Sequence, residues 1–226
     1  RLGLTATLVR EDGRESDVFS LIGPKRFDAP WKDIEAQGYI APAKCYEIRI
    51  TLPDEDRMKY AISDADSRFR IAATANAKLP ILKKLLDKNP NEPTLIIGQY
   101  LDQIDEVSKS LGIPKLTGET PVTEREQLFS DFRAGKLKAL VVSKVANFSV
   151  DLPEASLAIQ ISGSFGSRQE EAQRLGRLLR PKQDGRTAQF YTLVARDSVE
   201  QDFAQNRQRF LAEQGYSYEI LDAHSL

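Results

Sequence analysis

The sequence has very little cysteine and histidine: one residue of each, Cys45 and His224, in a chain of 226 residues. A single cysteine excludes an intrachain disulfide and is typical of proteins from a reducing compartment. Structural zinc sites take their ligands mostly from several cysteines and histidines, so we predict no zinc site and no other metal site. A lone histidine near the C-terminus also argues against Ser-His-Asp catalysis.

Long apolar runs are missing too. No stretch approaches the roughly 20 residues that a membrane-spanning helix needs, and we expect no signal peptide. The formal net charge is −1, so the overall electrostatic field does not indicate a nucleic-acid partner. Hydrophobic residues make up 41% and charged residues 29% of the chain. This composition and length predict a globular protein with a sizeable core, in one large domain or two small ones.

Strand and helix patterns alternate along the chain. The apolar runs predict strands at residues 46–52, 94–98, 113–116, 139–142, 157–161 and 187–194. Helical spacing predicts helices at residues 31–37, 54–69, 77–86, 101–111, 120–134 and 199–214, with Thr120 as the N-cap of the fifth. The alternation predicts an α/β fold with a mainly parallel sheet and helices on both faces. Since Arg1 opens directly into a strand-like pattern, we expect the sequence to be a piece of a longer protein.

Ligands of such sheets bind beyond the carboxyl ends of the strands. Three predicted loops leave these ends, at residues 98–100, 143–153 and 162–167. We therefore expect functional residues to gather in these loops.

The segment from Gln173 to Arg180 has the pattern of a helix with two faces. At about 100° per residue, Gln169, Gln173, Arg177 and Arg180 share one stripe, and leucines lie opposite. Gly176 lies beside the polar stripe, where the absence of a side chain would let a ligand come close. Two guanidiniums about one turn apart can hold phosphate oxygens as a fork. The alternative is a solvated basic face on a surface helix.

Four short motifs follow one another along the chain: Leu4-Thr5-Ala6-Thr7, Leu95-Ile96-Ile97-Gly98-Gln99, Val141-Val142-Ser143-Lys144 with Val150-Asp151-Leu152-Pro153, and the predicted helix from Gln173 to Arg180, here called the arginine helix. Taken in order, they resemble motifs III to VI of superfamily 2 helicases. The tripeptide Arg10-Glu11-Asp12 and the residues of the arginine helix are similar to one branch, the XPB DNA repair helicases.

The resemblance implies a RecA-like lobe that works as one of a pair, with ATP bound between the two. Residues 1–28 would be the end of the first lobe, and residues 29–226 would be the second lobe. A short thumb-like insertion is implied near residues 54–70.

The resemblance also implies roles at the nucleotide. Arg177 and Arg180 would be arginine fingers that stabilise the transferring phosphoryl group, a role worth roughly 10³–10⁵ in rate in other enzymes. Gln173 would align the fingers or the attacking water. Asp151 would contact the ribose of the nucleotide or the fingers, and Gly176 would be part of the nucleotide-binding site. For Asp151, a turn or cap residue before Pro153 is the alternative.

Contacts to the DNA backbone are implied for hydroxyl, amide and backbone N–H groups, which fix position rather than sequence. Tyr100 has two interpretations, a base-stacking residue or a residue packed on its own lobe. The implied contacts are Gln99, Tyr100, Thr117, Gly118, Ser143 and Lys144.

Near the start of the chain, Thr5 and Thr7 would link nucleotide state to strand binding, or they are ordinary strand residues. Arg10, Glu11 and Asp12 would help to separate strands, or they form a solvated charged turn.

Two parts of the family pattern are missing from the sequence. It has no Gly-Lys-Thr phosphate loop, because Gly135-Lys136 is followed by Leu137. It also has no Asp-Glu pair after a buried strand to hold magnesium. ATP and Mg²⁺ would therefore be bound mainly by the first lobe, and we expect this chain alone to have no ATPase activity.

The expected function is that of the C-terminal motor lobe of an ATP-dependent DNA helicase or translocase in DNA repair. The expected setting is prokaryotic, cytoplasmic and nucleoid-associated, and the expected partners are DNA, the first lobe and a repair nuclease. Two alternatives stay open: the translocating subunit of a restriction enzyme, and a RecA-like module that holds DNA or protein without hydrolysis.

Overall fold

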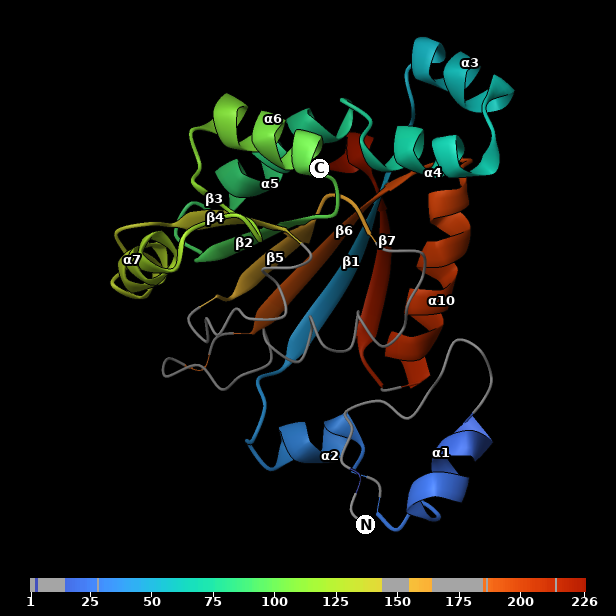
Figure 1. Ribbon diagram of the computed structural model, residues 1–226, viewed down its shortest axis with the longest axis vertical. Coiled ribbons are helices and arrows are strands. Elements are labelled where there is room, and N and C mark those ends of the chain that lie inside the picture. Colours follow the sequence, from blue (N-terminus) through green and yellow to red (C-terminus); the bar gives the residue numbers. More distant parts are fainter. Residues whose placement is uncertain are drawn as a thin grey trace.

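The computed structural model describes residue 3 and residues 15–27, 29–143, 155–163, 185, 187–213 and 215–226 (Figure 1). The strands of this part form one sheet in the order β3-β4-β2-β5-β6-β1-β7, and every pair is parallel. The predicted parallel α/β sheet is therefore confirmed. The strands are β1 (Ala43–Ile50), β2 (Thr94–Gly98), β3 (Lys115–Leu116), β4 (Ala139–Ser143), β5 (Leu157–Gln160), β6 (Ala188–Ala195) and β7 (Ser217–Asp222).

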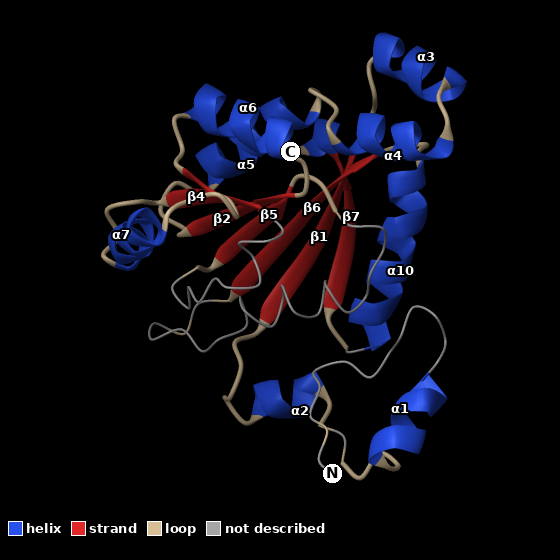
Figure 2. Cartoon of the chain, in the orientation of Figure 1, coloured by secondary structure: helices blue, strands red, loops and turns tan. Residues whose placement is uncertain are grey.

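Helices surround the sheet, as Figure 2 shows. Helices α5 and α6 pack on one face, where Leu82 and Ile104 join the core. Helices α7 and α10 pack on the other, where Phe132 and Leu211 do the same. The helices are α1 (Glu15–Ile22), α2 (Trp31–Ala36), α3 (Asp54–Ile62), α4 (Ala65–Ala73), α5 (Lys78–Lys88), α6 (Leu101–Leu111), α7 (Val122–Arg133), α10 (Val199–Glu213) and the short 3₁₀ helix η1 (Ala223–Ser225).

Strand β2 and helix α6 show how the local sequence produces these elements. All residues of β2 are buried, which suits a continuous apolar run covered on both faces. In α6, Ile104 and Val107 are buried at helical spacing. Gly112 ends the helix in the left-handed region with φ 64°, and its N–H donates to the Ser108 carbonyl.

Helices α3 and α4 form a layer at the carboxyl edge of the sheet. In Figure 1, α3 projects from the body beside α4, and none of its residues is buried. Helix α4 begins at Asp64, whose side chain accepts the Ser67 N–H, and it buries Phe69 against the body. The Val199 N–H donates to the Tyr60 hydroxyl over 2.8 Å, which ties the end of α3 to the start of α10.

Among the local differences between the predictions and the structure, three have a clear physical reason. Residues 54–69 form two helices rather than one, because Asp64 caps a new helix. Pro121 is the N-cap of α7, since the Thr120 hydroxyl accepts the Thr117 N–H instead. The sequence patterns did not indicate β7, whose residues are partly or fully exposed at the edge of the sheet. Such an edge strand needs no apolar alternation, and it is held by its pairing with β1.

Several predicted segments lie outside the described residues. They include the strand-like start of the chain, most of the loop at residues 143–153 and the arginine helix. In the described part, no helix is both long and apolar enough to cross a membrane.

Candidate functional site

Strand register brings the ends of β2, β3 and β4 to one edge of the sheet, where two of the three predicted loops begin. Gly98 at the end of β2 pairs with Ser143 at the end of β4, and Leu116 of β3 pairs with Val142. Because parallel strands end at a common edge, Gln99, Thr117 and Ser143 lie along the carboxyl edge, as expected for a ligand site. Ser143 is buried there with 3% exposure.

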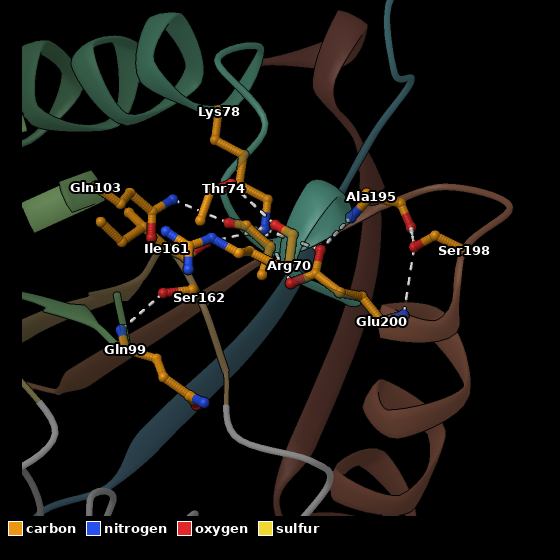
Figure 3. Close-up of polar contacts among 11 residues, drawn as sticks. Arg70, Thr74, Lys78, Gln99, Gln103, Ile161, Ser162, Ala195, Ser198 and Glu200 are labelled. Atoms are coloured by element: carbon orange, nitrogen blue, oxygen red, sulfur yellow. Dashed lines mark hydrogen bonds and ion pairs between the residues drawn. The ribbon is translucent and has the colours of Figure 1, made fainter. Parts of the chain in front are cut away.

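The backbone of Gln99 is anchored to the neighbouring strand β5. Its N–H donates to the Ser162 hydroxyl over 2.7 Å (Figure 3). Ser162 is itself only 1% exposed, and the Ile161 N–H before it donates to the Ile97 carbonyl. The side-chain oxygen Oε1 of Gln99 is buried and accepts no hydrogen bond from the described residues.

Thr117 and Gly118 form a tight turn between β3 and α7. The Thr117 N–H donates to the Thr120 hydroxyl, and the Thr117 hydroxyl accepts the Glu119 N–H. The Thr117 N–H is therefore already used within the turn. The exposed Gly118 remains the more accessible backbone position for an anion.

Tyr100 precedes the first residue of α6 and is half-buried. The guanidinium carbon of Arg70 lies 5.3 Å from the centre of its ring, within cation–π range. Burial raises the pKa of the Tyr100 hydroxyl, although Arg70 opposes this effect. The ring is therefore packed against a cation of its own lobe, which is one of the two interpretations expected for it.

A buried ion pair lies beneath this edge. The Lys78 ammonium donates to the Ala73 and Ile161 carbonyls at 3.0 and 2.9 Å and to the Glu200 carboxylate at 2.8 Å (Figure 3). The side chains of Lys78 and Glu200 are only 2% and 5% exposed. Burial lowers the pKa of Lys78, and the Glu200 carboxylate opposes that shift. The pair joins α4, α5 and α10 to Ile161, which follows β5 and directly precedes Ser162.

Sequence reasoning missed this pair, although a signal for it was present. Lys78 shares a helical stripe with the buried Leu82 and Leu85, and Glu200 shares one with the buried Ala204 and Leu211. A charged residue on an apolar stripe indicates a buried partner. Arg70 was missed as well, since it lies in a polar segment with no motif.

The remaining predicted site residues are outside the described part of the chain, so they stay predictions. Among the described residues, no group of three or more His, Cys, Asp and Glu side chains could hold a metal ion. The residues outside are Thr5, Thr7, Arg10, Glu11, Asp12, Lys144, Asp151, Gln173, Gly176, Arg177 and Arg180.

Comparison with known families matches residues 34–225 to the ERCC3/RAD25/XPB C-terminal helicase family. The whole chain is 64% identical to a Kineococcus radiotolerans protein and 63% identical to a Mycobacterium tuberculosis protein, both named DNA 3'-5' helicase XPB. The chain spans 41% of the length of each of these proteins. The chain is also 36% identical to a Drosophila melanogaster protein and spans 29% of its length. That protein is named the XPB helicase/translocase subunit of general transcription and DNA repair factor IIH.

Solved structures confirm the fold class. The C-terminal domain of the DEAD-box protein Dbp5 aligns with 81% of this chain and 92% of its own length, at a TM-score of 0.61 and 17% identity. A fragment of a putative HsdR subunit of a type I restriction enzyme from Vibrio vulnificus aligns with 95% of this chain and 43% of its own, at a TM-score of 0.67 and 19% identity. At such identities the likeness concerns the fold alone, which is that of a RecA-like helicase lobe.

Proposed function

The chain belongs to the ERCC3/RAD25/XPB C-terminal helicase family, and on this premise we propose that it is the second motor lobe of an ATP-dependent DNA helicase or translocase in DNA repair. The observation that carries the proposal is the family match over residues 34–225, which includes every strand of the sheet and the segment from Gln173 to Arg180. The names of the two bacterial relatives support 3′-to-5′ polarity and the use of ATP.

In this proposal ATP is bound between two lobes. Residues 29–226 form the second lobe, and residues 1–28 are the end of the first. The family match, which begins at residue 34, and the exposed apolar side chains of Leu21, Ile22 and Phe27 support this boundary. The short thumb-like insertion near residues 54–70 comprises α3 and the first part of α4. The phosphate loop and the carboxylates for Mg²⁺ would come from the first lobe.

The second lobe contributes Arg177 and Arg180 as fingers, with Gln173 aligning them and with Asp151 and Gly176 beside the nucleotide. The segment that holds the fingers follows β5, the middle strand of the sheet. The order of the elements along the chain thus supports a position of the two arginines at the carboxyl edge of the sheet. The charge of a guanidinium is useful mainly in the transition state, so its loss should lower kcat far more than nucleotide affinity.

The test uses Arg177→Ala and Arg180→Ala in the full-length protein, with DNA-stimulated ATPase and binding of a fluorescent ATP analogue as the two measurements. We expect kcat to fall by roughly 10³-fold or more while the Kd for the analogue stays within a few-fold. Arg174→Ala is the matched control, because Arg174 is off the predicted stripe, and it should retain hydrolysis. Retention of kcat by both finger variants would show that the assignment is wrong.

A second test concerns the isolated chain. Without a phosphate loop and an Asp-Glu pair, the purified 226-residue chain should show no DNA-stimulated, Mg²⁺-dependent ATP turnover. Measurable turnover that scales with the concentration of this chain would contradict the division of labour between the lobes.

The carboxyl edge supports the DNA-binding part of the proposal. Gln99, Tyr100 and Gly118 are at least partly exposed there, and Thr117 and Ser143 lie beside them. Lys144, the motif III hydroxyls of Thr5 and Thr7 and the Arg10-Glu11-Asp12 segment would complete the contacts. A repair nuclease partner and a nucleoid location stay predictions. ATP hydrolysis by the full-length protein would distinguish this function from a non-hydrolysing binding module.

A further inference from the structure

An exposed ion pair lies beside the predicted DNA contacts. Arg70, in the last turn of α4, donates through Nη2 to Oδ2 of Asp102, in the first turn of α6, over 2.5 Å. The two side chains are 56% and 59% exposed. The same guanidinium lies over the ring of Tyr100, the residue after Gln99. The pair therefore lies next to the loop that leaves β2.

Buried contacts hold both ends of this pair in place without its help. The Ala73 carbonyl, one turn after Arg70, accepts the Lys78 ammonium and the Gln103 side-chain amide. Gln103 follows Asp102, and its N–H donates to Asp102 Oδ1 over 3.0 Å. Since the end of α4 and the start of α6 are already joined, the exposed pair contributes little to the fold.

The chemistry of the pair suits an exchange of anions. Apart from the bond to Asp102, the guanidinium N–H groups of Arg70 make no hydrogen bond within the described residues. A guanidinium can hold a phosphate through two parallel bonds, as it can a carboxylate. The other predicted DNA contacts in the described part, Gln99, Tyr100, Thr117, Gly118 and Ser143, carry no positive charge. Arg70 would supply that charge.

We propose that Arg70 binds a phosphate of the DNA backbone, and that Asp102 holds the guanidinium of Arg70 until the phosphate replaces it. The proposal rests on the proposed function, because it adds a residue and a competing anion to the same edge. Tyr100 keeps the guanidinium over its ring in both states, so only the anion changes. Removing Asp102 should therefore strengthen DNA binding, whereas removing Arg70 should weaken it.

The experiment measures binding of a fluorescein-labelled, partly single-stranded DNA by the full-length protein at several salt concentrations without ATP. Arg70→Ala should weaken binding by about 3-fold to 10-fold and reduce the slope of log K against log [salt] by about 0.7–0.9, the value of one phosphate contact. Asp102→Asn, which keeps an oxygen for the Gln103 N–H, should tighten binding by about 1.5-fold to 5-fold. The double variant should behave as Arg70→Ala.

A second ion pair provides the matched control. Lys136 donates to Asp131 over 3.1 Å at the start of β4, on the amino edge of the sheet and away from the proposed contacts. Lys136→Ala and Asp131→Asn change the net charge by the same amounts and should leave DNA affinity within twofold. If Asp131→Asn tightens binding as much as Asp102→Asn, net charge explains the effect and the proposal is wrong.

The remaining outcomes separate this proposal from the proposed function. A wild-type protein that does not bind DNA would overturn both. Normal wild-type binding, with Arg70→Ala unchanged in affinity and salt slope, would overturn this proposal alone. Weaker binding by Asp102→Asn would refute the competition. A fluorescent ATP analogue should bind Arg70→Ala and wild type equally, and a loss confined to the analogue would assign Arg70 to the nucleotide instead.

Discussion

Replacing Glu200 by glutamine leaves the ammonium of Lys78 buried without its counter-charge. In the native protein the carboxylate accepts that ammonium at 2.8 and 2.9 Å and the Ala195 N–H at 2.9 Å. Loss of one member of a buried ion pair costs about 3–5 kcal/mol. Domains of this kind have a free energy of unfolding of about 5–15 kcal/mol. We therefore expect Glu200→Gln to lose about a fifth or more of that stability.

The stability lost in Glu200→Gln also has an upper limit. Lys78 can avoid the penalty by losing its proton, and for an amine with an ordinary pKa of about 10.4 this costs about 4.6 kcal/mol at pH 7. Burial already lowers the pKa of Lys78 in the folded protein, and Glu200 opposes the shift, so the pKa should fall further in the variant. Above that lowered value the unfolded state binds more protons than the folded state, and stability rises with pH. The difference in free energy of unfolding between the variant and the wild type should therefore become smaller from about pH 7 to pH 10.

Urea unfolding of the 226-residue chain, followed by circular dichroism and fluorescence, measures these differences. The double variant Lys78→Met/Glu200→Leu removes both charges and should be more stable than Glu200→Gln, because apolar replacements of a complete buried pair are often neutral. Glu55→Gln is the control: Glu55 pairs with Lys59 on the surface of α3, and the variant should keep the wild-type midpoint. A loss below about 1 kcal/mol in Glu200→Gln, or a double variant that loses the sum of the single losses, would refute the reasoning.

Two further predictions concern local packing and capping. Gly98→Ala would place a Cβ atom 2.8 Å from Ile104 Cγ1 and 3.4 Å from Ile161 Cδ1, so we expect a loss of about 1–3 kcal/mol in urea unfolding. Ile104→Ala should lower the free energy of unfolding less in the Gly98→Ala variant than in the wild type. Equal losses in the two backgrounds would show that the new Cβ atom does not clash with Ile104. The Asp64 carboxylate accepts hydrogen bonds from the backbone N–H and the hydroxyl of Ser67, and these bonds lower its pKa. The stability that Asp64 gives to α4 is therefore present near neutral pH and is lost as the pH falls through this lowered pKa. Hydrogen exchange of α4 between pH 5 and about pH 3 should show this loss in the wild type but not in Asp64→Asn, and the same loss in both would disprove the capping role.

Much of the fold could be predicted because its signals are local. Residues 101–111 have an apolar stripe and a following glycine, and the helix α6 has the predicted bounds. Strand β2 likewise matches its prediction, because it is a continuous apolar run between turn residues. Strand β7 could not be found in this way, since its stability comes from backbone pairing with β1, which precedes it by most of the chain.

The candidate site also has one part that local sequence signals predict and another that depends on contacts between distant residues. The strand pattern indicated the loops after β2, β4 and β5, and strand register brings the ends of these strands to one edge. The contacts of Arg70 and Lys78 could not be predicted in the same way. An ion pair requires two side chains to meet, and helical spacing on one element says nothing about the partner on another.

The sequence by itself determined the family, the alternation of strands and helices, and the edge of the sheet at which function is expected, because these depend on neighbouring residues and on motif order. Only the tertiary structure decided that Lys78 meets Glu200, 122 positions later, and that Arg70 meets Asp102, 32 positions later. The physical reason is that charge–charge and hydrogen-bond energies depend on distance in space. That distance follows from the strand order, which separation along the chain does not specify.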